Sequence, residues 1–307
     1  MSKTLSVFFN IDRTYLTVIE HTPNGLSLEY INSTKNRINF ENIGASIKGI
    51  DELHSIFKQL PEGISRATIT MPAEGVMVAQ FPGRSDLSKS DLEKLLSLEL
   101  RQIYPQFNFE DFKITLTPFS GINSKKQTML AVIIPLEDYE TINRIMEPLN
   151  LPISNIEISQ LNAHSCFIYN YPEMRDKTVA LLSVQNQFMD FSVVKNGSPA
   201  YYSLSNIGRI EAIGEVFENE FNKIVPNLFD SIDAVYYFGS GLTKDVSMML
   251  WETSMLLGIM ESKRLNAFRM MLTNLDKRDK EYCSRAFQLY PACVGGCMPA
   301  KHDFIKF

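Results

Sequence analysis

Alternating apolar and polar positions open this chain. Residues 4–25 read TLSVFFNIDRTYLTVIEHTPNG, which is an apolar strand, a polar turn, a second apolar strand and an Asn-Gly pair. Alternation of this kind predicts half-buried strands, and Asn-Gly supplies the positive φ of tight hairpins. Residues 178–197, TVALLSVQNQFMDFSVVKNG, repeat the pattern about 174 residues later. An internal repeat predicts two related lobes, each opened by an equivalent hairpin.

The patterns between the two repeats predict a compact unit of mixed structure. Ser88 followed by Asp91 is typical of a helix N-terminus, and a leucine-rich helical face follows it. Further elements are predicted as strands at residues 67–71, 76–81, 113–117 and 127–134, a turn at residues 121–126 and a helix at residues 139–149. We therefore predict an inserted α+β subdomain over residues 72–158, within a first lobe made of residues 1–71 and 159–177.

Helical patterns follow the second hairpin. Residues 178–307 predict a second lobe, with helices at residues 210–224, 243–260 and 278–289. In the middle helix a repeat at helical spacing predicts a face that packs in the core; it consists of Val246, Met249, Leu256 and Met260. An alternative is an adaptable partner surface, because methionine side chains repack easily; it would use Met248, Met249, Met255 and Met260. The spacing favours the core interpretation.

Composition narrows the class of protein. The chain has 307 residues, of which 45% are hydrophobic, so it can build two to three domains with real cores. Its net charge is -5 and its basic residues are scattered, which is unlike a nucleic-acid-binding protein. Apolar stretches at residues 129–136 and 248–260 are shorter or more interrupted than the roughly 18 residues of a membrane span. Residues 1–20 lack a signal-peptide pattern, and four cysteines in a chain of this size predict a reducing, cytoplasmic location.

Several blocks then carry a family resemblance, in a fixed order along the chain. The two hairpin turns are similar to an Asp-Ile-Gly-Ser and an Asp-Ile-Gly-Ala-Thr turn, and ELRQIYP at residues 99–105 is similar to Glu-x-x-x-Tyr-Ile-Pro. NIEI at residues 155–158 resembles a strand that returns to the first lobe. YFGSGL at residues 237–242 resembles an adenosine-side glycine turn, and ACVGGC at residues 292–297 resembles the start of a final helix.

Together these blocks resemble the PilM family, the actin-like cytoplasmic proteins of type IV pilus assembly. The resemblance implies an α/β fold of duplicated actin-like (RNase H-like) lobes with mixed sheets, plus an inserted α+β subdomain in the first lobe. It also implies that the final helix packs back on the first lobe. Only residues 208–230 separate the second hairpin from the glycine turn, enough for one helix, so the family's lid subdomain is expected to be reduced or absent.

The turns depart from the family where ATP and Mg²⁺ would bind. Actin-like ATPases hold the phosphates between two turns, with glycines for close approach and an acidic residue in each turn for the metal. Here the acidic positions hold Asn10 and Ser183, and glycine positions hold Asp12 and Gln185. Arg13 and Thr14 remain possible phosphate donors, and Gly239 and Gly241 mark the adenosine side. We expect a degenerate nucleotide cleft, no cofactor and no catalysis.

Two other kinds of site are less consistent with the sequence. The loop Gly239-Ser240-Gly241 has Lys244 where a dinucleotide loop needs its third glycine. A zinc site made of Cys283, Cys293, Cys297 and His302 lacks a Cys-x-x-Cys pair, and the glycine pair beside it fits close helix packing better. We therefore expect no metal site.

The resemblance implies an adaptor that binds partners. We expect the first lobe and its insert to form a groove for the cytoplasmic N-terminal segment of a PilN-like single-span protein, with other pilus assembly proteins as further partners. The expected groove residues are Met71, Val76, Val78, Phe81 and Tyr104; the alternative is that all five are interior. The expected location is cytoplasmic, peripheral to the inner membrane through partners. The alternative functions are an ATP-binding PilM-type ATPase and the cytoplasmic domain of a GspL-like type II secretion scaffold, which would be expected to continue into a membrane span.

Overall fold

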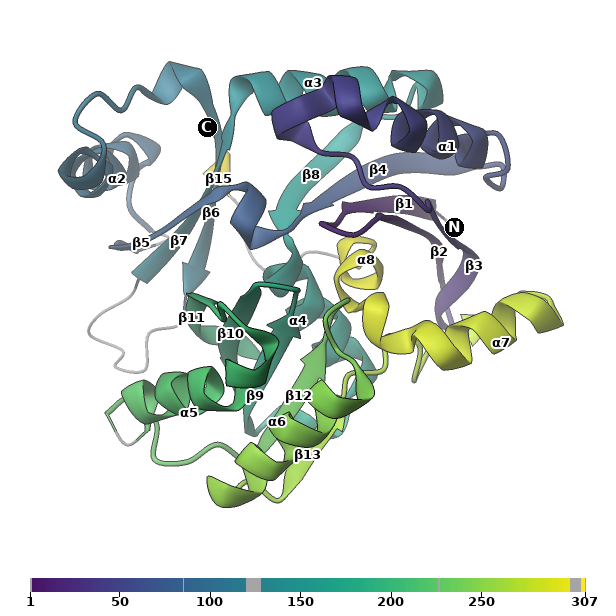
Figure 1. Ribbon diagram of the computed structural model, residues 1–307. Coiled ribbons are helices and arrows are strands. Elements are labelled where there is room, and N and C mark those ends of the chain that lie inside the picture. The colour runs from purple at the N-terminus through teal and green to yellow at the C-terminus, as the bar shows by residue number, and fades with distance from the viewer. Residues whose placement is uncertain (1, 85, 120–127, 226, 299–304, 307) are drawn as a thin grey trace.

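Two sheets with the same strand order form the body of the protein (Figure 1). The computed structural model describes residues 2–84, 86–119, 128–225, 227–298 and 305–306. The first sheet has the order β14-β3-β2-β1-β4-β8. Its strands are β1 (Ser2–Phe9), β2 (Thr14–Thr22), β3 (Gly25–Ser33), β4 (Ile64–Met71), β8 (Ile153–Ile158) and β14 (Leu272–Thr273).

The second sheet repeats this plan with the order β11-β10-β9-β12-β13. Its strands are β9 (Thr178–Val184), β10 (Phe188–Lys195), β11 (Ser198–Asn206), β12 (Ala234–Phe238) and β13 (Glu261–Arg264). In each sheet a hairpin pairs antiparallel with a third strand, and the fourth strand returns parallel to the first. Asn196 and Gly197 both adopt positive φ in the second lobe, whereas Gly25 does so in the first. The predicted duplication is confirmed.

Amphipathic helices cover the sheets. The helices are α1 (Ile47–Phe57), α2 (Lys89–Ile103), α3 (Leu136–Met146), α4 (Ser159–Asn170), α5 (Ile213–Ile224), α6 (Lys244–Leu256), α7 (Lys277–Ala286) and α8 (Pro291–Gly296). Leu53 of α1 and Ile142 of α3 share one core with Ile69 of β4. Phe217 of α5 and Leu250 of α6 share the core of the second lobe. Within the described residues, no helix is both long and apolar enough to cross a membrane.

The insert forms a small sheet of its own, in the order β15-β6-β7-β5. Its strands are β5 (Met77–Pro82), β6 (Phe112–Phe119), β7 (Thr128–Pro135) and β15 (Ile305–Lys306). As predicted, Ser88 caps α2: its side chain accepts a hydrogen bond of 3.2 Å from the backbone of Asp91. The buried leucines of α2 pack against Phe81 and Met129. The turn predicted at residues 121–126 lies outside the described residues.

Strand pairing places two boundaries elsewhere than the sequence predicts. The predicted insert, residues 72–158, includes β8, which pairs parallel with β4 in the first sheet, and α3, whose apolar face covers that sheet. The predicted second lobe, residues 178–307, includes β14, which pairs with β3 of the first sheet. The strands β8 and β14 are both short, and the strands that they pair with lie far away in sequence. Local patterns therefore do not reveal which sheet they join.

The middle helix of the second lobe also differs from prediction. Val246 is buried and Met249 is half-buried, but Leu256 is 88% exposed and Met260 is 83% exposed. The positions of α6 that face the core are Val246, Leu250 and Ser254, which recur every four residues. Leu256 lies off that row, and Met260 follows the end of the helix. Of the four residues predicted to face the core, only Val246 and Met249 therefore do so.

Two glycines let α8 pack closely against its neighbours. A Cβ on Gly295 would lie 1.7 Å from the backbone oxygen of Asn162 in α4, and one on Gly296 would lie 2.5 Å from Ser6 Oγ in β1. Contacts of under 3 Å do not occur at real Cβ atoms, so only glycine fits at these positions. The predicted packing of the final helix against the first lobe follows from this approach, since α8 contacts β1, β2 and β4.

Replacing Gly295 with alanine should destabilise the protein strongly, by about 3 kcal/mol or more, because the added methyl group forces α8 away from α4. Urea unfolding followed by circular dichroism measures the change. Gly44→Ala is the matched control: its Cβ would lie 3.7 Å from the nearest atom, so stability should change by less than about 0.5 kcal/mol. Equal effects of the two substitutions would contradict the packing argument.

Candidate functional site

The first turn, between β1 and β2, is held closed by its own side chains. The backbone N–H of Asn10 donates to the carbonyl oxygens of Phe8 and Arg13, each at 3.1 Å. Asp12 Oδ1 accepts a hydrogen bond from Asn10 Nδ2 at 2.9 Å, and its Oδ2 accepts one from Tyr15 OH at 2.7 Å. Arg13 Nε lies 3.3 Å from the same Oδ2. The guanidinium that could have contacted a phosphate therefore contacts Asp12.

Burial shapes the chemistry of this turn. Tyr15 is buried, and its pKa is raised above the usual value, first by burial and then by the neighbouring Asp12 carboxylate. Its hydroxyl therefore stays protonated and donates to Asp12. Thr14 is also buried, and its backbone N–H donates to Thr34 Oγ1 at 2.9 Å. The first turn is thus a packed structural unit in which Arg13 lies beside Asp12.

The second turn, between β9 and β10, is packed under the glycine loop that follows β12. Gln185 N donates to Phe188 O, and Gln185 Nε2 donates to Ser183 Oγ at 3.2 Å. A Cβ on Gly239 would lie 2.3 Å from Val184 O, and one on Gly241 would lie 2.8 Å from Gln185 O. The two glycines therefore serve the close contact between this loop and the second turn.

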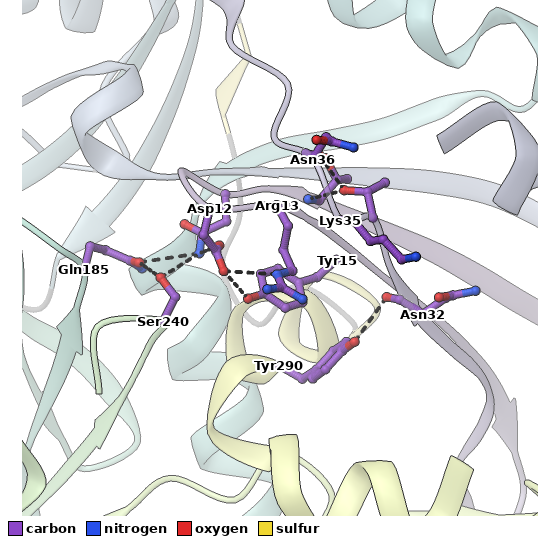
Figure 2. A network of polar contacts seen from close by, with 12 residues as sticks. Asp12, Arg13, Tyr15, Asn32, Lys35, Asn36, Gln185, Ser240 and Tyr290 are labelled. Atoms are coloured by element: carbon purple, nitrogen blue, oxygen red, sulfur yellow. Dashed lines mark hydrogen bonds and ion pairs between the residues drawn. The ribbon is translucent and has the colours of Figure 1, made fainter. Parts of the chain in front are cut away.

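Side-chain hydrogen bonds join the two turns directly across the lobes (Figure 2). Asn10 Nδ2 lies 3.4 Å from Gln185 Oε1 and 3.4 Å from Ser240 Oγ, and Ser240 donates to Gln185 at 2.7 Å. Asn10 and Gln185 are 3% and 1% exposed. We call this set the interlobe bridge: Asn10, Gln185 and Ser240.

The distances within the interlobe bridge decide whether a triphosphate fits between the turns. Atoms 3.4 Å apart are in direct contact, so no phosphate fits between Asn10 and Gln185 in this arrangement. Gln185 turns an acceptor oxygen toward the first turn, where a phosphate needs donors. Among the described residues, Asp12 is the acidic side chain of the two turns, and it is bound by Tyr15, Asn10 and Arg13. These residues do not fit ATP with magnesium.

Behind the second turn lies a buried acidic group that the sequence did not suggest. Asp190 of β10 is fully buried, opposite Ser183 in the hairpin, and it accepts a hydrogen bond of 2.8 Å from Tyr202 OH. Burial raises the pKa of Asp190 to about 7, and the nearby Glu74 carboxyl adds to the rise. Burial also raises the pKa of Glu74, on the segment that enters the insert. Only the fold brings these acids together, from elements more than a hundred residues apart.

The residues expected to form the partner groove do not form one surface. Met71 and Phe81 are 3% and 1% exposed and belong to two different cores. Val76 and Val78 are half-buried against the first of these cores. Tyr104 is 47% exposed, but it lines a separate pocket at the end of α2. For Met71 and Phe81 the interior alternative holds, because β4 and β5 turn these side chains toward their own sheets' helices.

A pocket does lie between the first lobe and the insert, at residues that the sequence did not single out. Its volume is about 200 Å³, and its lining combines four isoleucines with polar side chains: Lys113, Ile114, Thr115, Ile134, Tyr139, Ile153, Asn155 and Ile156. It lies beside β8, the last strand in the first sheet. Within the described part of the chain, Asn155 Oδ1 is buried and makes no hydrogen bond. We call this the insert groove.

The cysteines lie in or near the core formed by α8 and its neighbours. Cys293 and Cys297 are fully buried, and their thiols donate to the carbonyl oxygens of Ser6 and Thr4. Burial raises the pKa of Cys293 to about 12, which keeps it a thiol. Cys283 is half-buried, and His302, the fourth residue of the zinc alternative, lies outside the described residues.

The two lobes share one duplicated strand order, and a hairpin turn at the head of each lobe faces the other. This arrangement defines an actin-like fold. A solved structure described as a Bacteroides thetaiotaomicron protein with an actin-like ATPase fold and unknown function matches with a TM-score of 0.51, at 12% identity over 88% of this chain and 94% of that chain. The cytoplasmic domain of EpsL, an inner-membrane component of the Vibrio cholerae type II secretion system, has a TM-score of 0.49 at 10% identity, over 83% of this chain and 95% of that chain.

The fold is also similar to that of a solved PilM–PilN complex. The PilM–PilN type IV pilus biogenesis complex matches with a TM-score of 0.68, at 14% identity, over 96% of this chain and 99% of that chain. This confirms the predicted resemblance at the level of the fold. No protein-family model matches the sequence, and no curated protein is similar to it.

The buried acids predict a pH dependence of stability. The native protein keeps a proton on Asp190 up to about pH 7, whereas the unfolded chain releases it near 3.8. Between these values the native state binds more protons than the unfolded state, so stability falls as the pH rises and levels off above about pH 7. Glu157, with a pKa also raised to about 7 by burial, acts in the same direction.

Asp190→Asn should therefore flatten part of this profile and raise stability at pH 8 by roughly 2–4 kcal/mol, because the amide keeps the Tyr202 hydrogen bond without a buried charge. Urea unfolding from pH 5 to pH 8 measures it. The exposed Asp230→Asn is the control and should leave the profile unchanged. A native stability that rises with pH across this range would refute the assignment.

Proposed function

We propose that this protein is a non-catalytic, PilM-like adaptor whose insert groove binds the cytoplasmic N-terminal segment of a PilN-like inner-membrane protein. In this proposal it works in the cytoplasm and is peripheral to the inner membrane through that partner. Its role would be to hold together the assembly proteins of a pilus or of a related machine.

The observation that carries the docking proposal is the outer edge of β8 at the insert groove, which pairs with no other strand among the described residues. Since β8 ends the first sheet, its outer edge offers backbone groups to an added extended segment. Ile153 and Asn155 both line the groove, one on each side of a register shift between β8 and β4. Asn155 Oδ1, buried and without a hydrogen bond in the described structure, would accept a backbone or side-chain donor of the peptide.

The neighbouring fold supports the choice of partner. The similar solved structure is a complex of PilM with PilN, and the likeness covers both chains almost completely. A groove lined by isoleucines suits a segment with alternate apolar side chains, and Lys113 and Asn155 in the same lining supply polar contacts. A short segment of a membrane-anchored protein could reach such a groove because it needs no folded domain of its own.

The interlobe bridge supports the non-catalytic part of the proposal. A nucleotide would have to break the contacts of Asn10 with Gln185 and Ser240 before its phosphates could enter. It would gain no magnesium carboxylate from the second turn, where Ser183 and Gln185 stand. The broken contacts and the missing magnesium carboxylate both weaken nucleotide binding. Without charged groups already in position, phosphoryl transfer also loses the main source of its rate acceleration.

Tyr139→Ala should weaken binding of the partner peptide at least about tenfold, because the ring forms one wall of the insert groove. The probe is a synthetic N-terminal peptide of the PilN-like single-span protein from the same organism, titrated by calorimetry. Tyr104→Ala is the matched control: this tyrosine lies in the other pocket, so its loss should leave affinity unchanged. The reverse pattern would favour the groove first expected from the sequence, and no binding by the unmodified protein would reject the proposal.

A phosphate-release assay with ATP and Mg²⁺ should give no signal above buffer, and Asp12→Ala should behave identically, because Asp12 is bound within its own turn. Release of phosphate that disappears in Asp12→Ala would show catalysis and overturn the non-catalytic part. It would leave the peptide result standing, so the two parts of the proposal fail separately.

A further inference from the structure

The outer face of α6 exposes more apolar surface than a surface helix of a monomer needs. Met248 is 53% exposed and Trp251 is 48% exposed on the helix, and Leu256 and Met260 at its end are more than four-fifths exposed. Trp251 is the chain's single tryptophan. Large exposed apolar side chains gathered on one element are typical of a binding surface. This surface is far from the insert groove, since it belongs to the second lobe.

An acidic row lies along the neighbouring helix. α5 packs on the same core as α6, and a Cβ on its Gly214 would lie 2.8 Å from Thr253 Oγ1 of α6, so the two helices touch. Glu215 and Glu218 of α5 are exposed, and so is Glu211 in the short 3-10 turn (Ile210–Ala212) that leads into the helix. Their spacings of four and three residues place the three glutamates on one side.

Two carboxylates of α6 extend the row. Asp245 and Glu252 are exposed and two helical turns apart, so they also share one side of their helix. In the described parts of the chain, no Lys or Arg forms an ion pair with any of the five carboxylates; the ion pairs there involve other acids. Exposed apolar side chains and carboxylates without an ion pair thus lie together on this side of the second lobe, with Asp245 and Glu252 between Met248 and Leu256 around α6.

We propose that this surface, the α5–α6 face, binds a basic amphipathic helix of a partner protein. The apolar side of such a helix covers Met248, Trp251 and Leu256, while its Lys or Arg side chains lie against the glutamates of α5 and of the turn that precedes it. Helix-in-groove recognition uses this combination of an apolar stripe for affinity and charges for orientation. The proposal concerns a second partner site and does not depend on the insert groove.

Charge argues against the two other occupants of an exposed apolar helix. A second copy of the chain would bring two sets of five carboxylates to one interface, and their repulsion opposes a symmetric dimer. An anionic membrane surface would repel the same row, since membrane-binding helices carry basic borders. A cationic partner gains from every one of these groups.

The test uses the emission of Trp251, which reports on this face alone because no other tryptophan is present. The probe is the tryptophan-free peptide acetyl-LKKLLKLLKKLLKL-amide, added to the full chain. We expect a blue shift of the emission with saturable binding, weakened at least about tenfold by raising NaCl to about 0.5 M. A scrambled peptide of the same composition, which places no apolar stripe on a helix, should bind at least about tenfold more weakly.

Matched variants separate this face from the general negative charge of the protein. Glu211→Gln, Glu215→Gln and Glu218→Gln together should weaken binding about tenfold or more. Glu137→Gln, Glu140→Gln and Glu147→Gln together change the net charge equally, on exposed positions of the first lobe, and should leave affinity within about twofold. Equal weakening by both sets, or an emission that does not respond, overturns the proposal.

Two further measurements address the other occupants. Sedimentation equilibrium should show a monomer, and anionic phosphatidylserine vesicles should leave the Trp251 emission unchanged. Dimerisation that Leu256→Glu abolishes would assign the face to a second copy, and a vesicle-induced blue shift would assign it to a membrane; either result overturns the proposal.

Discussion

Close contact between the backbones of α4 and α8 is the constraint on which the arrangement of the two lobes depends. α4 places Cys166 in the core around β2 and β3 and Phe167 in the core beneath β9, so it belongs to both lobes. Gly295 lets α8 touch α4, and Gly296 lets it touch β1. Because α8 thereby holds α4 against the first sheet, the turn at the end of β1 comes to face the turn at the end of β9.

The interlobe bridge is a consequence of that arrangement. Once the turns face each other, their polar side chains are shielded from water and must find partners in each other. Asn10 supplies the donor and Gln185 the acceptor, with Ser240 bonded to both. These three side chains are thus complementary, whereas Asn10 Oδ1 and Thr14 Oγ1 are buried without a hydrogen bond in the described structure. What is a ligand site in an ATPase of this fold is here a contact between two halves of one protein.

Local sequence patterns predict the duplicated hairpins, the cap of α2 and the altered turns, because period-two alternation, Asn-Gly and a short cap motif each act within a few residues. They do not predict contacts set by the fold. Asn10 and Gln185 are 175 residues apart. In the sequence each substituted turn therefore shows only that the family's residues are missing, and the contact between the two side chains becomes visible only in the structure. Met71 and Val76 are apolar whether they face a core or a groove, so hydrophobicity alone does not separate these outcomes. The free edge of β8 is a property of strand order, which emerges only when the sheet is complete.

The duplicated plan also explains why the two lobes differ in size. In the first lobe, residues 72–135 connect β4 to α3 and include three of the four strands of an extra sheet. The equivalent connection of the second lobe is residues 239–243, where Gly239 and Gly241 lie against Val184 and Gln185 with no space to spare. Any segment added there would pull this loop off the neighbouring hairpin. At this connection the first lobe therefore had room to acquire new chain, while the second lobe did not.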